Sequence, residues 1–97
     1  MEAMAGFTVV ELQGEYDITR RDELDNLLDR YGDIDSLAFD LHAVDCMDTS
    51  AVRSLVRFQR ARKEAGRAPI VLLKPSEEVR QFFEAAQLEH TFEIRED

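Results

Sequence analysis

The chain has 97 residues, a formal net charge of −9 and one cysteine. This length supports one domain with a single core and little room for a deep active-site cavity. The acidic balance argues against nonspecific binding to nucleic acid, and no segment approaches the ~20 apolar residues that direct membrane insertion as a span requires. Residues 1–6 lack the pattern of a secretory signal and Cys46 cannot form an internal disulfide, so we expect a soluble cytoplasmic protein.

The first third of the chain is predicted to form two strands and one helix. Residues 7–12 indicate a strand, Gln13-Gly14 a break, and residues 15–18 a short second strand. Residues 19–22 resemble a capping box, with Asp in place of the usual final Glu or Gln. The helix that follows has one apolar face, with residues at positions i, i+3, i+4 and i+7: Leu24, Leu27, Leu28 and Tyr31.

The middle of the chain predicts a strand and then a long helix. Residues 36–41 alternate apolar and other side chains, as a strand does. The helix is expected from about Ser50 to Ala65, with its core face formed by Val52, Leu55 and Val56. At 100° per residue, three arginines fall together on the opposite face: Arg53, Arg57 and Arg60.

The last third predicts a buried strand, a helix and a closing strand. Residues 70–73 are a continuous apolar run between two prolines, which indicates a strand covered on both faces. Residues 76–78 open a third helix, and residues 88–94 form a short closing strand. The order ββαβαβαβ predicts an α/β fold, a single domain over residues 1–97 with three main helices and a four- to five-stranded mixed, mainly parallel sheet.

Basic residues concentrate in one segment of this acidic chain. Residues 50–67 hold six of the twelve Lys and Arg residues, opposed only by Glu64. The six are Arg53, Arg57, Arg60, Arg62, Lys63 and Arg67. Two interpretations remain open: a solvated helix face, as is usual, or a docking surface for an acidic partner.

The triplet Asp48-Thr49-Ser50 stands where a strand gives way to a helix. On these three residues alone, helix capping is the commoner role. The same position favours anions, because the unpaired N–H groups and the helix dipole attract negative charge. A hydroxyl there can also carry a phosphate, whose charge can switch a docking surface.

We find no motif of catalysis, and we expect neither a cofactor nor a metal. The sequence has no GxGxxG, P-loop or CxxC, and His42 and His90 lack metal-ligand spacing. Cys46 is expected to be a buried structural thiol, and the pair Asp45 and Asp48 has no obvious partner base. The sequence therefore predicts a binding module or a substrate of another enzyme, and not an enzyme.

Several segments in order resemble the STAS domain of bacterial anti-sigma factor antagonists and of sulfate transporter tails. They are Gly14-Glu15-Tyr16-Asp17, the strand at 37–41, the stretch Val44 to Ser50, Glu64-Ala65-Gly66, the strand at 70–73 and the helix at 79–88. The likeness covers nearly the whole chain. It departs from the family pattern at Ala51 and Arg53, where glycine is common, and at Thr49, where Ser is commoner.

The resemblance implies a partner-switching protein. It would bind an anti-sigma factor with serine/threonine kinase activity and so release a sigma factor, and a phosphatase would reverse the phosphorylation. Carried onto this chain, the phosphoacceptor is Thr49, with Ser50 as the fallback. Asp48 matches the Asp of the family's turn, and Asp17 matches the Asp of its second-strand motif. Together with Arg53 and Arg57 these residues are the expected partner-binding surface.

The family also suggests alternatives that need no phosphorylation. One is a STAS subunit that docks on the ATPase of an ABC-type lipid transporter, and another is a stressosome-like scaffold. Independently of the resemblance, the same helix N-terminus also allows a small-molecule or nucleotide binder.

Overall fold

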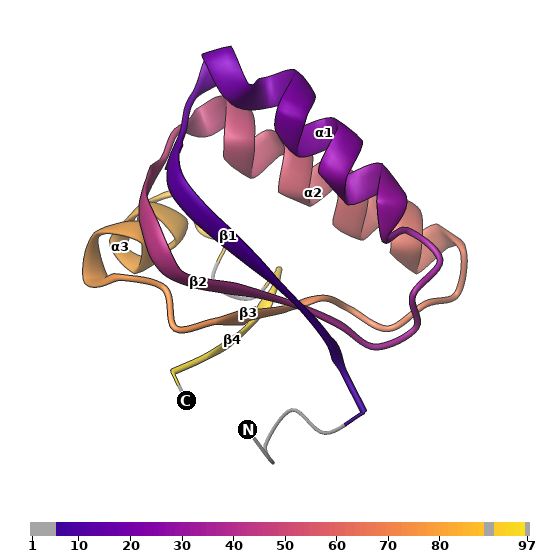
Figure 1. Cartoon of the computed structure of the whole chain (residues 1–97). Helices are drawn as coiled ribbons and strands as arrows, with labels where there is room; N and C mark the ends of the chain where they lie inside the picture. The colour runs from indigo at the N-terminus through magenta and orange to yellow at the C-terminus, as the bar shows by residue number, and fades with distance from the viewer. Residues whose placement is uncertain (1–5, 89–90, 97) are drawn as a thin grey trace.

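The computed structural model describes residues 6–88 and 91–96. Its elements, in chain order, are β1 (Thr8–Tyr16), the 3-10 turn η2 (Ile18–Arg20), α1 (Arg21–Arg30), β2 (Leu37–Met47), α2 (Thr49–Glu64), β3 (Val71–Leu73), α3 (Glu77–Ala85) and β4 (Glu93–Arg95) (Figure 1). The predicted α/β fold with three main helices is confirmed, and within the described residues the sheet has four strands.

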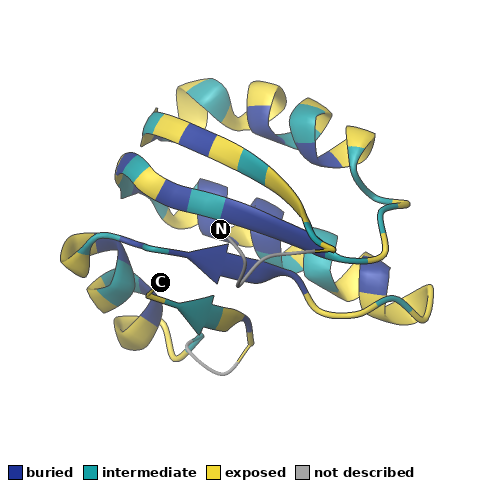
Figure 2. Cartoon of the chain, turned by 60° about the horizontal axis from the view of Figure 1, so that its bottom comes forward, coloured by how far each residue is buried: buried dark blue, intermediate teal, exposed yellow. Residues whose placement is uncertain are grey.

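The four strands lie side by side in sequence order, β1-β2-β3-β4, and each described pair is parallel. Right-handed crossovers between successive parallel neighbours place all three helices on one face of the sheet. Figure 2 shows β1 and β2 in front of α2. We call the face away from the helices the outer face.

The core lies between the sheet and the three helices. β2 and β3 direct apolar side chains toward the helices, and Phe39, Leu41 and Leu72 are fully buried there. α1 contributes Leu24 and Leu28, as its apolar periodicity predicts. A smaller apolar cluster on the outer face contains Ala38, Val71 and Leu73, with Phe7 packed against it. This second cluster explains why β3 is apolar on both sides.

The first strand is one element and not the two that the sequence suggested. β1 continues through Gly14, whose φ of 88° lies in the left-handed region. The Arg20 Nη1 donates to the carbonyl oxygens of Gln13 and Glu15, which flank this glycine. Gly14 is therefore a bend within β1, held by a guanidinium from η2.

The predicted capping box at residues 19–22 is wrong. The cap belongs to Asp17, which precedes η2 and accepts from the Thr19 N–H at 3.0 Å. Arg20 stands at the start of α1 and makes no side-chain capping bond. The Asp17 side chain forms an Asx-type hydrogen bond in place of a capping box, because the chain makes a tight turn before α1 begins.

The strand predicted to end at Leu41 continues to Met47. The register between β1 and β2 shifts twice, after Glu11 and after Gly14, and each time β2 carries one extra residue. Buried residues in β2 therefore change from a spacing of two to a spacing of three, at Leu41, Val44 and Met47. The alternation that identifies a strand is lost at these positions, although the pairing continues.

Arg62 belongs to the interior and not to the basic face. Its side chain is 1% exposed. The guanidinium donates to four carbonyl oxygens in the loops before β2 and β3: those of Gly32, Ile34, Asp35 and Ala68. Burial lowers the pKa of Arg62, because the charged form loses water, but the carbonyl oxygens replace that water as acceptors.

The last third agrees with prediction at the third helix and differs at the closing strand. Ser76 caps α3 by accepting from the Val79 N–H, and Val79 and Phe83 are buried. The closing strand is shorter than predicted, because β4 begins at Glu93; residues 89–90 of the predicted range lie outside the described part of the chain. No helix in that described part is long and apolar enough to cross a membrane.

Because the guanidinium of Arg62 is buried, we predict that even a conservative substitution of this residue destabilises the fold. We expect Arg62→Lys to lower the free energy of unfolding by about 2–4 kcal/mol, since an ammonium cannot reach carbonyl oxygens from two loops at once. The measurement is urea unfolding followed by far-ultraviolet circular dichroism. Arg60→Lys, an exposed change on the same helix, should stay within about 0.5 kcal/mol. Equal effects of the two variants would refute the role given to Arg62.

Candidate functional site

The candidate site is the junction between β2 and α2, at the carboxyl ends of β1 and β2. Tyr16 pairs with Met47 in the parallel register, and the Asp48 N–H donates to the Tyr16 carbonyl oxygen at 3.0 Å. Asp48 is extended, with ψ of −176°, and α2 begins at the next residue. The junction therefore brings η2, which follows Asp17, close to the first turn of α2, and the Ile18 N–H donates to the Asp48 carboxylate.

Asp48 is the cap of α2, a role that the sequence left open among three residues. Its Oδ1 accepts from the Ala51 N–H at 3.1 Å and from the Ser50 hydroxyl at 2.6 Å. The Ser50 hydroxyl holds the pKa of Asp48 below its usual value, and the N–H groups of Ala51, Ser50 and Ile18 add to this. The carboxylate is thus ionised at neutral pH and fixed in orientation.

The two neighbouring hydroxyls differ in their surroundings. Ser50 is half-buried, and its hydroxyl is engaged by Asp48. Thr49 is exposed, and among the described residues no side-chain hydrogen bond involves its hydroxyl. The hydroxyl that is free to react is therefore that of Thr49.

A shallow groove of about 420 Å³ extends from Thr49 between α2 and α3. We call it the α2–α3 groove. It is lined by Thr49, Val52, Arg53, Val56, Arg57, Arg60, Phe82, Ala86 and Leu88. Its apolar side chains and its arginines give a surface that is both hydrophobic and cationic.

The basic face of α2 is narrower than the sequence count suggests. Arg62 is buried, and Arg67 pairs with Asp33 and Asp35. Arg57 lies 3.7 Å from a carboxylate oxygen of Asp25 on α1. Within the described residues, Arg53, Arg60 and Lys63 make no ion pair. These three side chains are therefore the cations of α2 most open to a partner. We call the row of basic residues that runs along α2 from Thr49 the cationic stripe.

An exposed isoleucine next to the site was missed in the sequence analysis. Ile18 is 62% exposed, at the start of η2 and directly after Asp17. A large apolar side chain this exposed at a motif turn is typical of a contact residue. The sequence did offer a signal for this residue, because Ile18 directly follows the motif Gly14 to Asp17. The sequence analysis instead placed Ile18 at the end of a strand.

Cys46 and Asp45 contribute no reactive group. Cys46 is half-buried and not fully buried as predicted. Burial raises the pKa of the Cys46 thiol, and the nearby carboxylates, Glu15 first among them, raise it further. A thiol of raised pKa is a poor nucleophile. Asp45 is exposed on the strand before the cap, so it does not form a carboxylate pair with Asp48 in a pocket.

A family model described as the STAS domain matches residues 1–97. No curated protein matches the chain. A solved structure of a putative anti-sigma factor antagonist from Thermotoga maritima, TM1081, aligns with a TM-score of 0.84 at 15% identity, covering 94% of this chain and 80% of that one. The anti-sigma factor antagonist SpoIIAA in its unphosphorylated form aligns with a TM-score of 0.67 at 17% identity, covering 94% and 79%. At these identities the two structures establish a common fold.

The cap predicts a pH-dependent contribution of Asp48 to stability. We expect Asp48→Ala to lower the free energy of unfolding by about 1 kcal/mol at pH 7, because the first turn of α2 loses its acceptor. The folded pKa of Asp48 lies below the usual 3.8, so the stabilisation by the charged form is complete above that pH and is lost as pH falls through the folded value.

Urea unfolding of the wild type and the variant between pH 7 and pH 3 measures this difference. Asp45→Ala, an exposed change three residues earlier, is the matched control and should have little effect. A deficit in Asp48→Ala that stays constant down to the lowest pH would show that charge has no part in the cap.

Proposed function

Because the chain belongs to the STAS domain family, we propose that it is an anti-sigma factor antagonist that works by partner switching. In its unmodified form it binds an anti-sigma factor with serine/threonine kinase activity, and a sigma factor is released. The kinase transfers a phosphoryl group to Thr49, the complex dissociates, and a phosphatase restores the binding form. This cycle takes place in the cytoplasm.

The free hydroxyl of Thr49 is the observation that carries the proposal. An acceptor must reach the active site of another protein, and Thr49 is exposed in the first turn of α2. The Ser50 hydroxyl is held by Asp48 at 2.6 Å and would have to break that bond first. Thr49 is therefore preferred over Ser50 as the acceptor.

A phosphoryl group on Thr49 would meet charges of both signs. It adds roughly −1.5 to −2 charges at pH 7, beside the ionised Asp48 and at the favourable positive end of α2. Arg53 lies one helical turn further along the same side of α2, and both residues line the α2–α3 groove. The phosphoryl group would therefore draw Arg53 into an ion pair within the chain. The cationic stripe would then be weaker for an acidic partner, without any unfolding.

The partner surface of the proposal combines apolar and charged contacts. Asp17, Asp48, Thr49 and Ser50 lie at the junction, and Arg53 and Arg57 lie on α2. Ile18 adds an exposed apolar side chain at the same end of the sheet. Apolar anchors give most of the binding energy in such surfaces, and the charges mainly set the association rate and the choice of partner. This arrangement supports a binding module and not an enzyme.

Phosphorylation at Thr49 is tested by mass spectrometry of the protein isolated from its own host cells. We expect close to one phosphate per chain in one growth condition, located on Thr49 by peptide fragmentation. Thr49→Ala should remove it, and Ser50→Ala should leave it in place. A phosphate on Ser50 would keep the cycle and correct the acceptor.

The absence of phosphate in every growth condition would contradict the switch. A subunit that is bound constantly, as on the ATPase of an ABC-type transporter, would then be the better explanation. Proteins that co-purify with the unmodified chain would decide between these cases.

The role of the cationic stripe is tested by the kinetics of partner binding. With the co-purified partner immobilised, we expect Arg53→Gln to lower the association rate constant several-fold at low salt, and the loss to shrink as salt screens the charge. Arg30→Gln, which removes an exposed arginine from α1, is the control and should bind like the wild type. Equal association rates for the two variants would show that the stripe is only a solvated helix face.

A further inference from the structure

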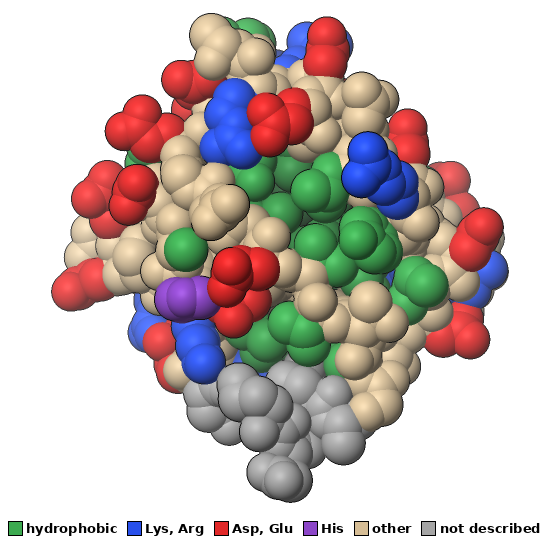
Figure 3. Space-filling view, viewed as in Figure 1, with side chains coloured by type: hydrophobic (Ala, Val, Ile, Leu, Met, Phe, Trp, Pro, Cys, Tyr) green, Lys and Arg blue, Asp and Glu red, His purple; other side chains and the backbone are tan. Residues whose placement is uncertain are grey.

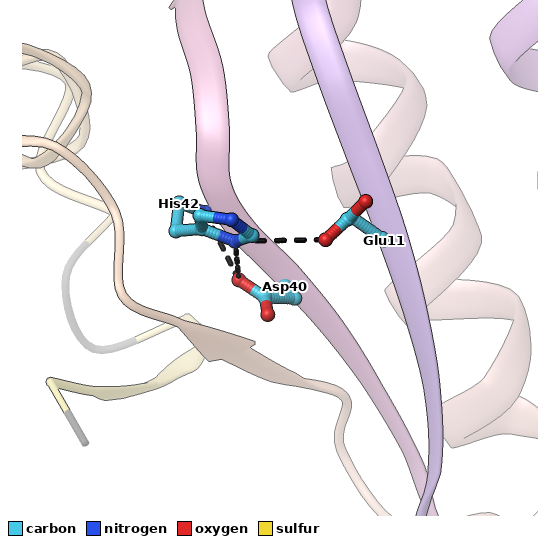
Figure 4. A group of neighbouring side chains, drawn as sticks. All are labelled: Glu11, Asp40 and His42. Atoms are coloured by element: carbon cyan, nitrogen blue, oxygen red, sulfur yellow. Dashed lines mark hydrogen bonds and ion pairs between the residues drawn. The ribbon is translucent and has the colours of Figure 1, made fainter.

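A second cluster of polar side chains lies on the outer face of the sheet, on the side opposite the helices. Glu11 extends from β1, and Asp40 and His42 extend from β2 (Figure 4). One ligand atom from each of the three lies within 4.8 Å of the other two. In the space-filling view an imidazole and acidic side chains touch at the surface (Figure 3).

The distances in this cluster suit a metal ion. The His42 Nδ1 is hydrogen-bonded to the Asp40 Oδ1 at 2.9 Å and lies 3.7 Å from the Glu11 Oε2. In a tetrahedral zinc site with bonds of 2.0–2.2 Å, neighbouring ligand atoms stand about 3.4 Å apart. The two observed distances lie on either side of that value. In such a site the ion would take the place of the hydrogen bond between His42 and Asp40, and the exposed side chains of Glu11 and His42 would turn toward it.

The backbone holds the three residues in this arrangement. Glu11 and Asp40 are direct partners in the parallel register of β1 and β2, so their side chains leave the same face side by side. The His42 N–H donates to the Asp40 Oδ1 at 3.0 Å, which orients that carboxylate. The extra residue in β2 follows Asp40 immediately, and bulges of this kind commonly direct a side chain toward a site.

We propose that Glu11, Asp40 and His42 bind a divalent transition metal ion of the zinc class at the outer face. An imidazole nitrogen with two carboxylate oxygens suits Zn²⁺ and its neighbours in the first transition row, whereas Mg²⁺ and Ca²⁺ take oxygen ligands. The two carboxylates balance the charge of the ion, and solvent fills the remaining position. The site is separate from the Thr49 junction and does not rest on the proposed partner switching.

The neighbouring residues determine how tightly this site would bind an ion and how the ion would affect stability. Lys74 lies close enough to Asp40 to stabilise its carboxylate, so a bound cation is opposed by that ammonium. With three exposed or partly exposed ligands, we expect affinity in the micromolar range and not in the range of structural zinc sites. A bound ion would join β1, an edge strand, to β2 by side chains as well as by the backbone. It would therefore raise the thermal stability of the whole chain.

The test is calorimetric titration of ZnCl₂ into the 97-residue chain, prepared without an affinity tag. We expect one ion per chain. His42→Gln and Glu11→Gln should each weaken binding at least about tenfold, since each removes a ligand. The matched controls are His90→Gln, which changes the other histidine, and Glu15→Gln, which changes an exposed carboxylate on the same strand. Both controls should bind like the wild type.

A second readout separates loss of the site from loss of the fold. Added zinc should raise the melting temperature of the wild type and of both controls, but not that of His42→Gln, whose circular dichroism without zinc should match the wild type. The proposal is overturned if zinc does not bind, if binding survives His42→Gln, or if His90→Gln or Glu15→Gln weakens it as much.

Discussion

The parallel pairing of β1 with β2 is the constraint on which the rest of the molecule depends. It continues to Tyr16 and Met47, and the hydrogen bond from the Asp48 N–H to the Tyr16 carbonyl oxygen closes it. The side chain of the same residue, Asp48, caps α2, which begins at Thr49. One residue therefore ends the sheet pairing and starts the central helix. Any movement of the helix N-terminus relative to β1 would break contacts on both sides of Asp48.

This double role of Asp48 also explains why adjacent hydroxyls differ. A cap that accepts from the Ala51 N–H points along the helix axis, and Ser50 lies within its reach. Thr49 is the first residue of α2 and projects from the other side of that turn, into the α2–α3 groove. The chemistry of the site thus follows from capping geometry. The capping interpretation and the phosphoacceptor interpretation of the triplet are compatible, since they apply to different residues.

The sequence predicted the helices and the class of the fold, because the periodicity of apolar residues is a local property. It missed the length of β2, because bulges replace a spacing of two by a spacing of three at Leu41, Val44 and Met47. The sequence analysis counted Arg62 among the basic residues of a helix surface, although it stands seven residues after Leu55 and so on the same side of α2. Only the carbonyl oxygens of distant loops make that burial possible, and no local pattern reports them. Likewise the motif located the candidate site, but the choice between Thr49 and Ser50 required the Asp48 hydrogen bonds.

The two ends of the sheet are stabilised by different means, and this bears on how a switch can work. Arg62 holds the loops at the amino ends of β2 and β3, where no candidate site residue lies. The junction at the carboxyl ends relies on the Asp48 cap and on the edge of the core. A phosphoryl group at Thr49 would add charge at the second end and leave the Arg62 contacts unchanged. A change of surface charge on a rigid domain would then be sufficient for the proposed switch. A partner that binds charged groups beside the exposed Ile18 would distinguish the two forms without any change of fold.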